Sequence, residues 1–144
     1  MPIPKKIAAM ALMLACASAA MAAPAPYMTL DHSSQAVMDK ATAQAVWREQ
    51  LPAKLTKRLF KLYPSNRWGF VSQVEGGFNA DKVCVVTARA MLLPRAGKSL
   101  SFRPDKTATA FDARPGITQE QCKELAKAKL GEAIEAVLSS LVAS

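Results

Sequence analysis

Few residues of this 144-residue chain could carry out chemistry, and none has the spacing of a catalytic motif. Histidine occurs once, as His32, in a segment that we expect to be a flexible leader. A nucleophile activated by this histidine would depend on a base outside the folded domain, which disfavours Ser-His-Asp and Cys-His chemistry. Outside the predicted export signal, one histidine and two cysteines also cannot supply a transition-metal site. We therefore expect no cofactor and no metal.

Carboxylates near the ends of predicted strands are the remaining candidates for catalysis. They are Glu75, Asp81, Asp105 and Asp112. Two of them could flank a glycosidic bond as acid and base, although turn formation and solubility explain these positions more simply. We expect that the chain is not an enzyme. The alternative is a small hydrolase that acts on a cell-envelope polymer, with Glu75 and Asp112 as the pair to test.

Two of the three cysteines, those outside the predicted export signal, indicate a structural bond. Cys84 and Cys122 lie 38 positions apart, with no C-x-x-C motif and no neighbouring histidine. A redox or metal role is therefore disfavoured, and in an oxidising compartment the two should form a disulfide. Closing a loop of this length stabilises a fold by about 4 kcal/mol in the chain-entropy description.

Basic residues cluster on a helix predicted from Pro52 to about Leu62. Proline is favoured at the first helical position, and leucines recur at near-helical spacing, at Leu51, Leu55, Leu59 and Leu62. The opposite face carries no acidic residue and four basic ones, Lys54, Lys57, Arg58 and Lys61. Such a helix could bind an anionic membrane surface or an acidic partner. The simpler interpretation is a surface helix with its leucines in the core.

The other periodic segments predict an α+β fold. A helix is expected over residues 35–50, and strands over 67–75, 82–93, 98–103 and 106–112, with turns at Gly76-Gly77 and Pro115-Gly116. Thr118 and Gln121 form a capping box that predicts a helix extending to about residue 142. We expect a three- to four-stranded antiparallel β-meander packed with the N-terminal helices and with a C-terminal helix that is pinned by the disulfide.

The central strand has two different faces. Its even positions are all apolar, namely Cys84, Val86, Ala88, Ala90 and Leu92, which predicts that this face lies in the core. The odd positions carry Val83, Val85, Met91 and Leu93 around Arg89, a mixed surface. Either the N-terminal helices cover this second face, which we favour slightly, or it serves for partner docking or a homodimer through Arg89 and its neighbours.

The N-terminus has the pattern of a cleavable export signal. Lys5 and Lys6 precede an uncharged run from Ile7 to Met21, which is too short for a membrane span, and Ala20-Met21-Ala22 suits signal peptidase. We expect a signal peptide at 1–22, a flexible leader at 23–33 and a single domain at 34–144, with no transmembrane segment in the mature form. In a minor alternative, Cys16 is the lipidated first residue of a lipoprotein.

Composition indicates what kind of partner suits the chain. Lysine and arginine number 19 against 11 acidic residues, so without Lys5 and Lys6 the mature chain keeps a net charge of +6. An exported, periplasmic protein meets little nucleic acid, so this charge favours an anionic envelope component or a protein partner, unless it serves solubility alone. We expect a small basic accessory protein that binds rather than catalyses. The sequence does not identify the partner.

Overall fold

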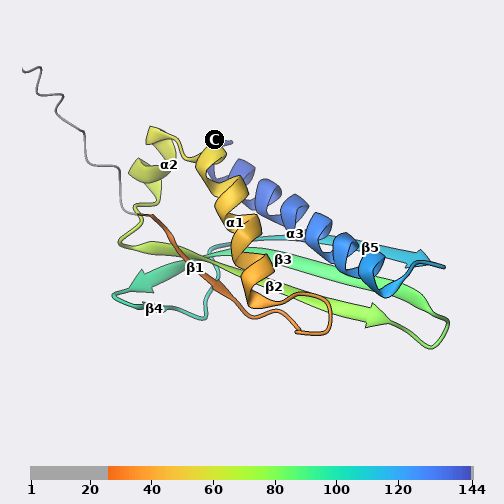
Figure 1. The fold of residues 1–144 in the computed structure, drawn as a ribbon. Coiled ribbons are helices and arrows are strands. Elements are labelled where there is room, and N and C mark those ends of the chain that lie inside the picture. The colour runs from red at the N-terminus through yellow and green to blue at the C-terminus, as the bar shows by residue number, and fades with distance from the viewer. Residues whose placement is uncertain (1–25, 144) are drawn as a thin grey trace, which may run out of the picture.

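The computed structural model describes residues 26–143. The signal peptide that we predict over residues 1–22, and the alternative lipidation of Cys16, lie outside the described residues. The elements follow in the order β1 (Met28–Asp31), α1 (Lys40–Lys54), α2 (Lys57–Leu62), β2 (Trp68–Phe78), β3 (Val83–Ala96), β4 (Ser99–Leu100), β5 (Lys106–Pro115) and α3 (Gln119–Val142). Helices α1 and α3 lie together on one side of the sheet (Figure 1).

The sheet confirms an α+β fold but is not purely antiparallel. Strands β2, β3 and β5 form the expected antiparallel meander, and the two-residue β4 pairs with the end of β3. Strand β1 pairs with the side of β2 that faces away from β3, and it runs parallel to β2. Met28 lies opposite Gly69, and Asp31 lies opposite Ser72. The two helices α1 and α2 form the crossover that a parallel pair of strands requires.

Strand β1 corrects the prediction of a flexible leader over residues 23–33, as far as these residues are described. Beyond the strand, the backbone N–H of His32 donates to Ser72 O at 2.9 Å, and that of Ser34 donates to Val74 O at 2.8 Å. The buried hydroxyl of Ser72 donates to Asp31 Oδ1 at 2.7 Å. These bonds hold the segment against β2.

The first two helices begin and end at positions other than those predicted. Asp39 caps α1 by accepting the Thr42 N–H at 2.8 Å, and this hydrogen bond is the main cause that lowers the pKa of Asp39. Pro52 lies in the last turn of α1 and does not start the second helix. That helix, α2, begins only at Lys57, because Thr56 caps it by accepting the Leu59 N–H at 3.1 Å.

The strands confirm the predicted faces and extend some of the predicted lengths. All five even positions from Cys84 to Leu92 of β3 are completely buried. Strand β2 continues through Gly76 and Gly77, which were expected to form a turn, and β5 continues to Pro115. The strand expected over 98–103 is reduced to β4. The core lies between this sheet face and the helices, with Trp47 and Phe70 in contact at a ring-centroid distance of 5.2 Å.

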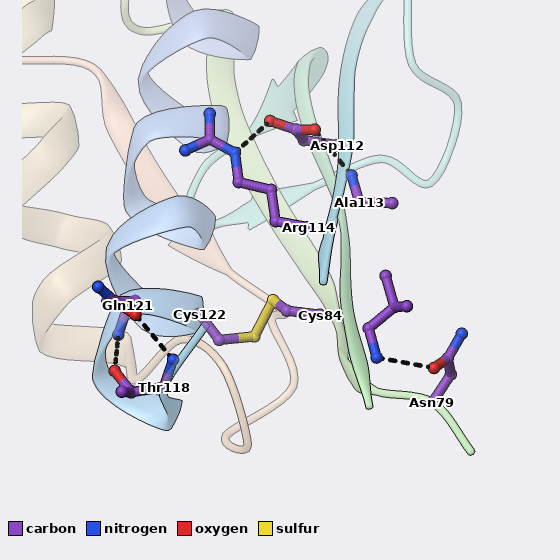
Figure 2. The surroundings of a disulfide bond; sticks show 9 residues. Asn79, Cys84, Asp112, Ala113, Arg114, Thr118, Gln121 and Cys122 are labelled. Carbon is purple, nitrogen blue, oxygen red and sulfur yellow. Dashed lines mark hydrogen bonds and ion pairs between the residues drawn. A yellow bond between two sulfur atoms is a disulfide. The ribbon is translucent and has the colours of Figure 1, made fainter. Parts of the chain in front are cut away.

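The last helix is joined to the central strand as expected. Thr118 and Gln121 form the predicted capping box at its start (Figure 2). Cys122 follows in the first turn and is bonded to Cys84, with their Cα atoms 5.8 Å apart. Both cysteines are fully buried. The disulfide therefore connects the helical layer to the sheet at the end where β3 begins.

Candidate functional site

The second face of the sheet, formed by the odd positions of β3, is one of two candidate surfaces. Because α1 and α3 both pack on the even face of β3, the described helices leave its odd face uncovered, contrary to the coverage that we favoured. Arg89 is exposed on this face and lines a shallow hollow of about 290 Å³ together with Gln73, Glu75 and Thr87. Arg89 and Glu75 therefore carry opposite charges at the walls of the same hollow, without forming an ion pair with each other.

An apolar groove occupies the end of this face near β4. It encloses about 470 Å³ between the sheet and the segment 98–104, and its floor is formed by Leu30, Val71, Met91 and Leu93. Val71 and Leu93 are 6% and 5% exposed, so the segment already covers part of the sheet there. Phe102, which lines the groove, is 90% exposed. The groove could hold an apolar group, and polar side chains at its walls could orient a ligand, namely His32, Gln73, Lys98, Ser99 and Ser101.

The four basic residues of the predicted helix are divided between two helices. Lys54 ends α1, and its Nζ lies 3.4 Å from Glu135 Oε1. Lys57, Arg58 and Lys61 lie on α2, are exposed, and make no ion pair with any residue from 26 to 143. Arg89 lies apart from them on the open sheet face. The structure therefore keeps three of the five predicted binding residues together.

Helix α2 is fixed by its apolar side. Leu59 is fully buried, whereas Leu62 is 48% exposed. Phe60 stacks on the ring of Tyr27, whose hydroxyl donates to the carbonyl of Tyr63 at the end of the helix. With Leu59 directed into the core, the basic side chains are held at the surface.

Two arginines that the sequence reasoning did not select extend the basic surface of α2. Arg67 follows α2 and receives a backbone hydrogen bond on its carbonyl from the Arg95 N–H, at 2.7 Å. The guanidinium of Arg95 donates to the carbonyls of Ser65 and Gly97. We define the basic end as Lys57, Arg58, Lys61, Arg67 and Arg95. The sequence signal for it was the absence of any acidic residue from 51 to 74.

The carboxylates proposed for a hydrolase do not meet. Glu75 lies opposite Thr87 of β3, whereas Asp112 lies opposite Val86, so their side chains point to opposite faces of the sheet. The Ala113 N–H is the main cause that lowers the pKa of Asp112, with Arg114 and Lys129 contributing (Figure 2). A lowered pKa does not suit a general acid. These two carboxylates therefore cannot act on one bond.

Asp31 belongs to a polar network that the sequence reasoning missed. Its Oδ1 accepts hydrogen bonds from the hydroxyls of Ser33, at 2.6 Å, and Ser72, at 2.7 Å. Ser33 Oγ in turn accepts the Val74 N–H at 2.8 Å. Each of these hydrogen-bonding groups has a partner within the fold, so we interpret the network as structural.

Among residues 26–143, no group of three or more histidine, cysteine or acidic side chains could hold a metal ion. Within the same range, no helix combines the length and the apolar character needed to cross a membrane.

Comparison with known proteins gives weak structural likenesses. No protein-family profile matches the chain, and no curated protein sequence matches it. Among solved structures, the PelC dodecamer from Paraburkholderia phytofirmans is 10% identical with a TM-score of 0.42, covering 81% of this chain and 94% of that chain. A point variant of the same dodecamer is 8% identical with a TM-score of 0.45, covering 77% and 87%. At these values the likeness supports no inference about function.

Proposed function

We propose that the protein is an exported, non-enzymatic accessory protein that binds an anionic membrane surface of the cell envelope through its basic end. The observation that carries the proposal is the side of α2 that presents Lys57, Arg58 and Lys61 without an ion-pair partner among the described residues. Arg67 and Arg95 add two positive charges on the adjoining segments.

Electrostatic attraction to anionic lipid supplies the binding energy. A basic residue near an anionic membrane contributes about 1 kcal/mol, which falls off within a Debye length. The three residues of α2 alone would then contribute about 3 kcal/mol, or roughly two orders of magnitude in affinity. Such binding is strong at low salt and weak at high salt.

One further feature favours a membrane over an acidic protein. Leu62 is half exposed beside the basic side chains, so α2 also offers an apolar contact at the headgroup boundary.

The disulfide supports the proposed export. Cys84 and Cys122 are joined, and bonds of this kind form and persist mainly in oxidising compartments such as the periplasm. Fractionation of cells that produce the full chain, with mass spectrometry of the N-terminus, tests this part. We expect a periplasmic protein that begins at Ala23; a cytoplasmic protein that retains Met1 to Ala22 would contradict it.

Vesicle co-sedimentation tests the membrane interaction. The wild type should bind vesicles of phosphatidylglycerol and phosphatidylcholine at low salt, bind pure phosphatidylcholine poorly, and be released at high salt. The variant Lys57→Glu/Arg58→Glu/Lys61→Glu should lose at least about a hundredfold in affinity, because it removes three attractive charges and adds three repulsive ones.

The matched control places the same charge change at the opposite end of the molecule. Lys82→Glu/Lys123→Glu/Lys127→Glu alters the hairpin between β2 and β3 and the first half of α3, and thermal unfolding should show that both variants are folded. The control should bind much more tightly than the α2 variant. Equal binding by the two variants, or a wild type that does not bind anionic vesicles at low salt, would contradict the proposal.

A further inference from the structure

Strand β5 is a long sheet edge. It pairs with β3 over its full length from Lys106 to Pro115, and no described residue pairs with its other side. An unpaired edge of this length offers a row of N–H and C=O groups to another strand.

Two hydrogen bonds show which residues point toward that outer edge. The Arg95 N–H, at an odd position of β3, donates to Arg67 O on the β2 side, so the even positions of β3 face β5 and pair there with the even positions of β5. The Ala113 N–H is at an odd position of β5 and donates to the carboxylate of its neighbour Asp112 at 2.8 Å. Because the backbone groups of successive residues in an antiparallel strand point to alternate sides, those of Thr107, Thr109 and Phe111 face the outer edge as well. The next outward N–H, that of Ala113, already donates to the Asp112 carboxylate. The stretch that remains available for pairing with another strand therefore runs from Thr107 to Phe111.

This stretch lacks the devices that usually protect an edge. Between Thr107 and Phe111 there is no charge, no proline and no glycine, and threonine and phenylalanine favour strands. Phe111 is 62% exposed on the face away from the helices. The edge is therefore suited to pairing with another strand.

We propose that a second copy of the chain pairs with this edge, antiparallel and with its two-fold axis at Thr109. Thr109 then exchanges two backbone hydrogen bonds with Thr109 of the second copy. On each side of the axis, Thr107 of one copy exchanges two backbone hydrogen bonds with Phe111 of the other copy. In the same register, Lys106 lies opposite Asp112 of the second copy at both ends of the ladder. Lys106 forms no ion pair within the described residues, so this contact would add Lys106 to Arg114 and Lys129, which Asp112 already pairs with in its own chain.

Neighbouring registers lack this complementarity. An axis at Ala110 would place Lys106 opposite Arg114 of the second copy, which sets like charges against each other. An axis at Phe111 would need the Ala113 N–H, already bonded to Asp112, and an N–H from Pro115, which has none. The self-complementary charges of the Thr109 register favour a second copy over a strand from a different protein.

Sedimentation equilibrium of the full chain tests the pairing. The wild type should show a concentration-dependent monomer–dimer equilibrium. Thr109→Pro removes an N–H that points away from β3, so it should keep the fold by circular dichroism and raise the dissociation constant at least tenfold. Thr109→Val keeps the N–H and should still form the dimer. Lys106→Glu should weaken the dimer, whereas Lys82→Glu, on a distant hairpin, should not.

Cysteine cross-linking tests the register itself. In a Cys16→Ser background, Thr109→Cys places two thiols on directly paired residues, whose Cα atoms lie about 5.5 Å apart in a hydrogen-bonded pair, within disulfide range. Thr107→Cys is the control, because Thr107 pairs with Phe111 and not with its own counterpart. Efficient cross-linking of the Thr109 variant alone supports the register. Equal cross-linking of both, or a wild type that is monomeric at all concentrations and so leaves the edge to other proteins, overturns the proposal.

Discussion

The ring of Tyr27 lies stacked on the ring of Phe60, with centroids 5.4 Å apart and an angle of 13° between the planes. The contact joins the residue before β1 to the short helix α2, and an edge-on contact between Tyr27 and Phe70 continues it into the sheet. The point where the chain enters the fold is therefore part of the core.

Tyr27 should make the free energy of unfolding decrease at alkaline pH. Burial raises its pKa to about 12, whereas an unfolded tyrosine titrates near 10. The unfolded chain therefore loses this proton first, so the stabilisation is fully present below about pH 10 and is lost as the pH rises toward 12. We expect Tyr27→Phe to cost about 1 kcal/mol at pH 7, from the lost hydrogen bond to Tyr63 O.

Urea unfolding of both proteins from pH 8 to 11.5 measures this effect. The decline of wild-type stability above pH 10 should be shallower in Tyr27→Phe. Tyr63→Phe serves as the control, since the Tyr63 ring remains able to pack on Trp68. Parallel curves for the wild type and Tyr27→Phe would show that Tyr27 does not cause the alkaline loss.

The disulfide should supply a large part of the stability. Cys84→Ala/Cys122→Ala opens a loop of 38 residues between two fully buried positions, and we expect the free energy of unfolding to fall by about 4 kcal/mol. Urea unfolding of the variant, with the wild type measured before and after reduction, gives the value. Reduced wild type should resemble the variant, and a titration of two free thiols in the native protein would refute the bond.

Two glycines should respond to alanine in opposite directions. A Cβ on Gly76 would lie 2.0 Å from Val85 O, and the φ of 146° disfavours any side chain, so Gly76→Ala should cost about 2 to 3 kcal/mol. A Cβ on Gly131 would meet only the movable amide of Gln50 at 2.6 Å. Gly131→Ala should therefore gain up to about 1 kcal/mol from helix propensity. Thermal unfolding compares the two, and equal losses would contradict this account.

The parts of the fold that could be predicted are those whose signals are local. Alternation along β3 identified its core face, and the capping box at Thr118 identified the start of α3, because both patterns depend on residues within one element. The cysteine pair followed from composition and compartment alone.

The missed parts depend on contacts between distant segments. The four residues of β1 are too few to show a period, and they form a strand only because β2 accepts their hydrogen bonds. Pro52 is tolerated in the last turn of α1, where the sequence also permitted a helix start. Similarly, the opposite orientation of Glu75 and Asp112 follows from the pairing register, which neither strand contains by itself.

The parallel β1 also implies an order of events during folding. Strands β2, β3 and β5 follow one another closely and can pair by closing short loops, whereas β1 must wait until α1 and α2 have returned the chain to β2. The meander with α3 should thus form a nucleus onto which β1 docks late. The amide protons of His32 and Ser34, which form hydrogen bonds to β2, should exchange with solvent sooner than those of β3.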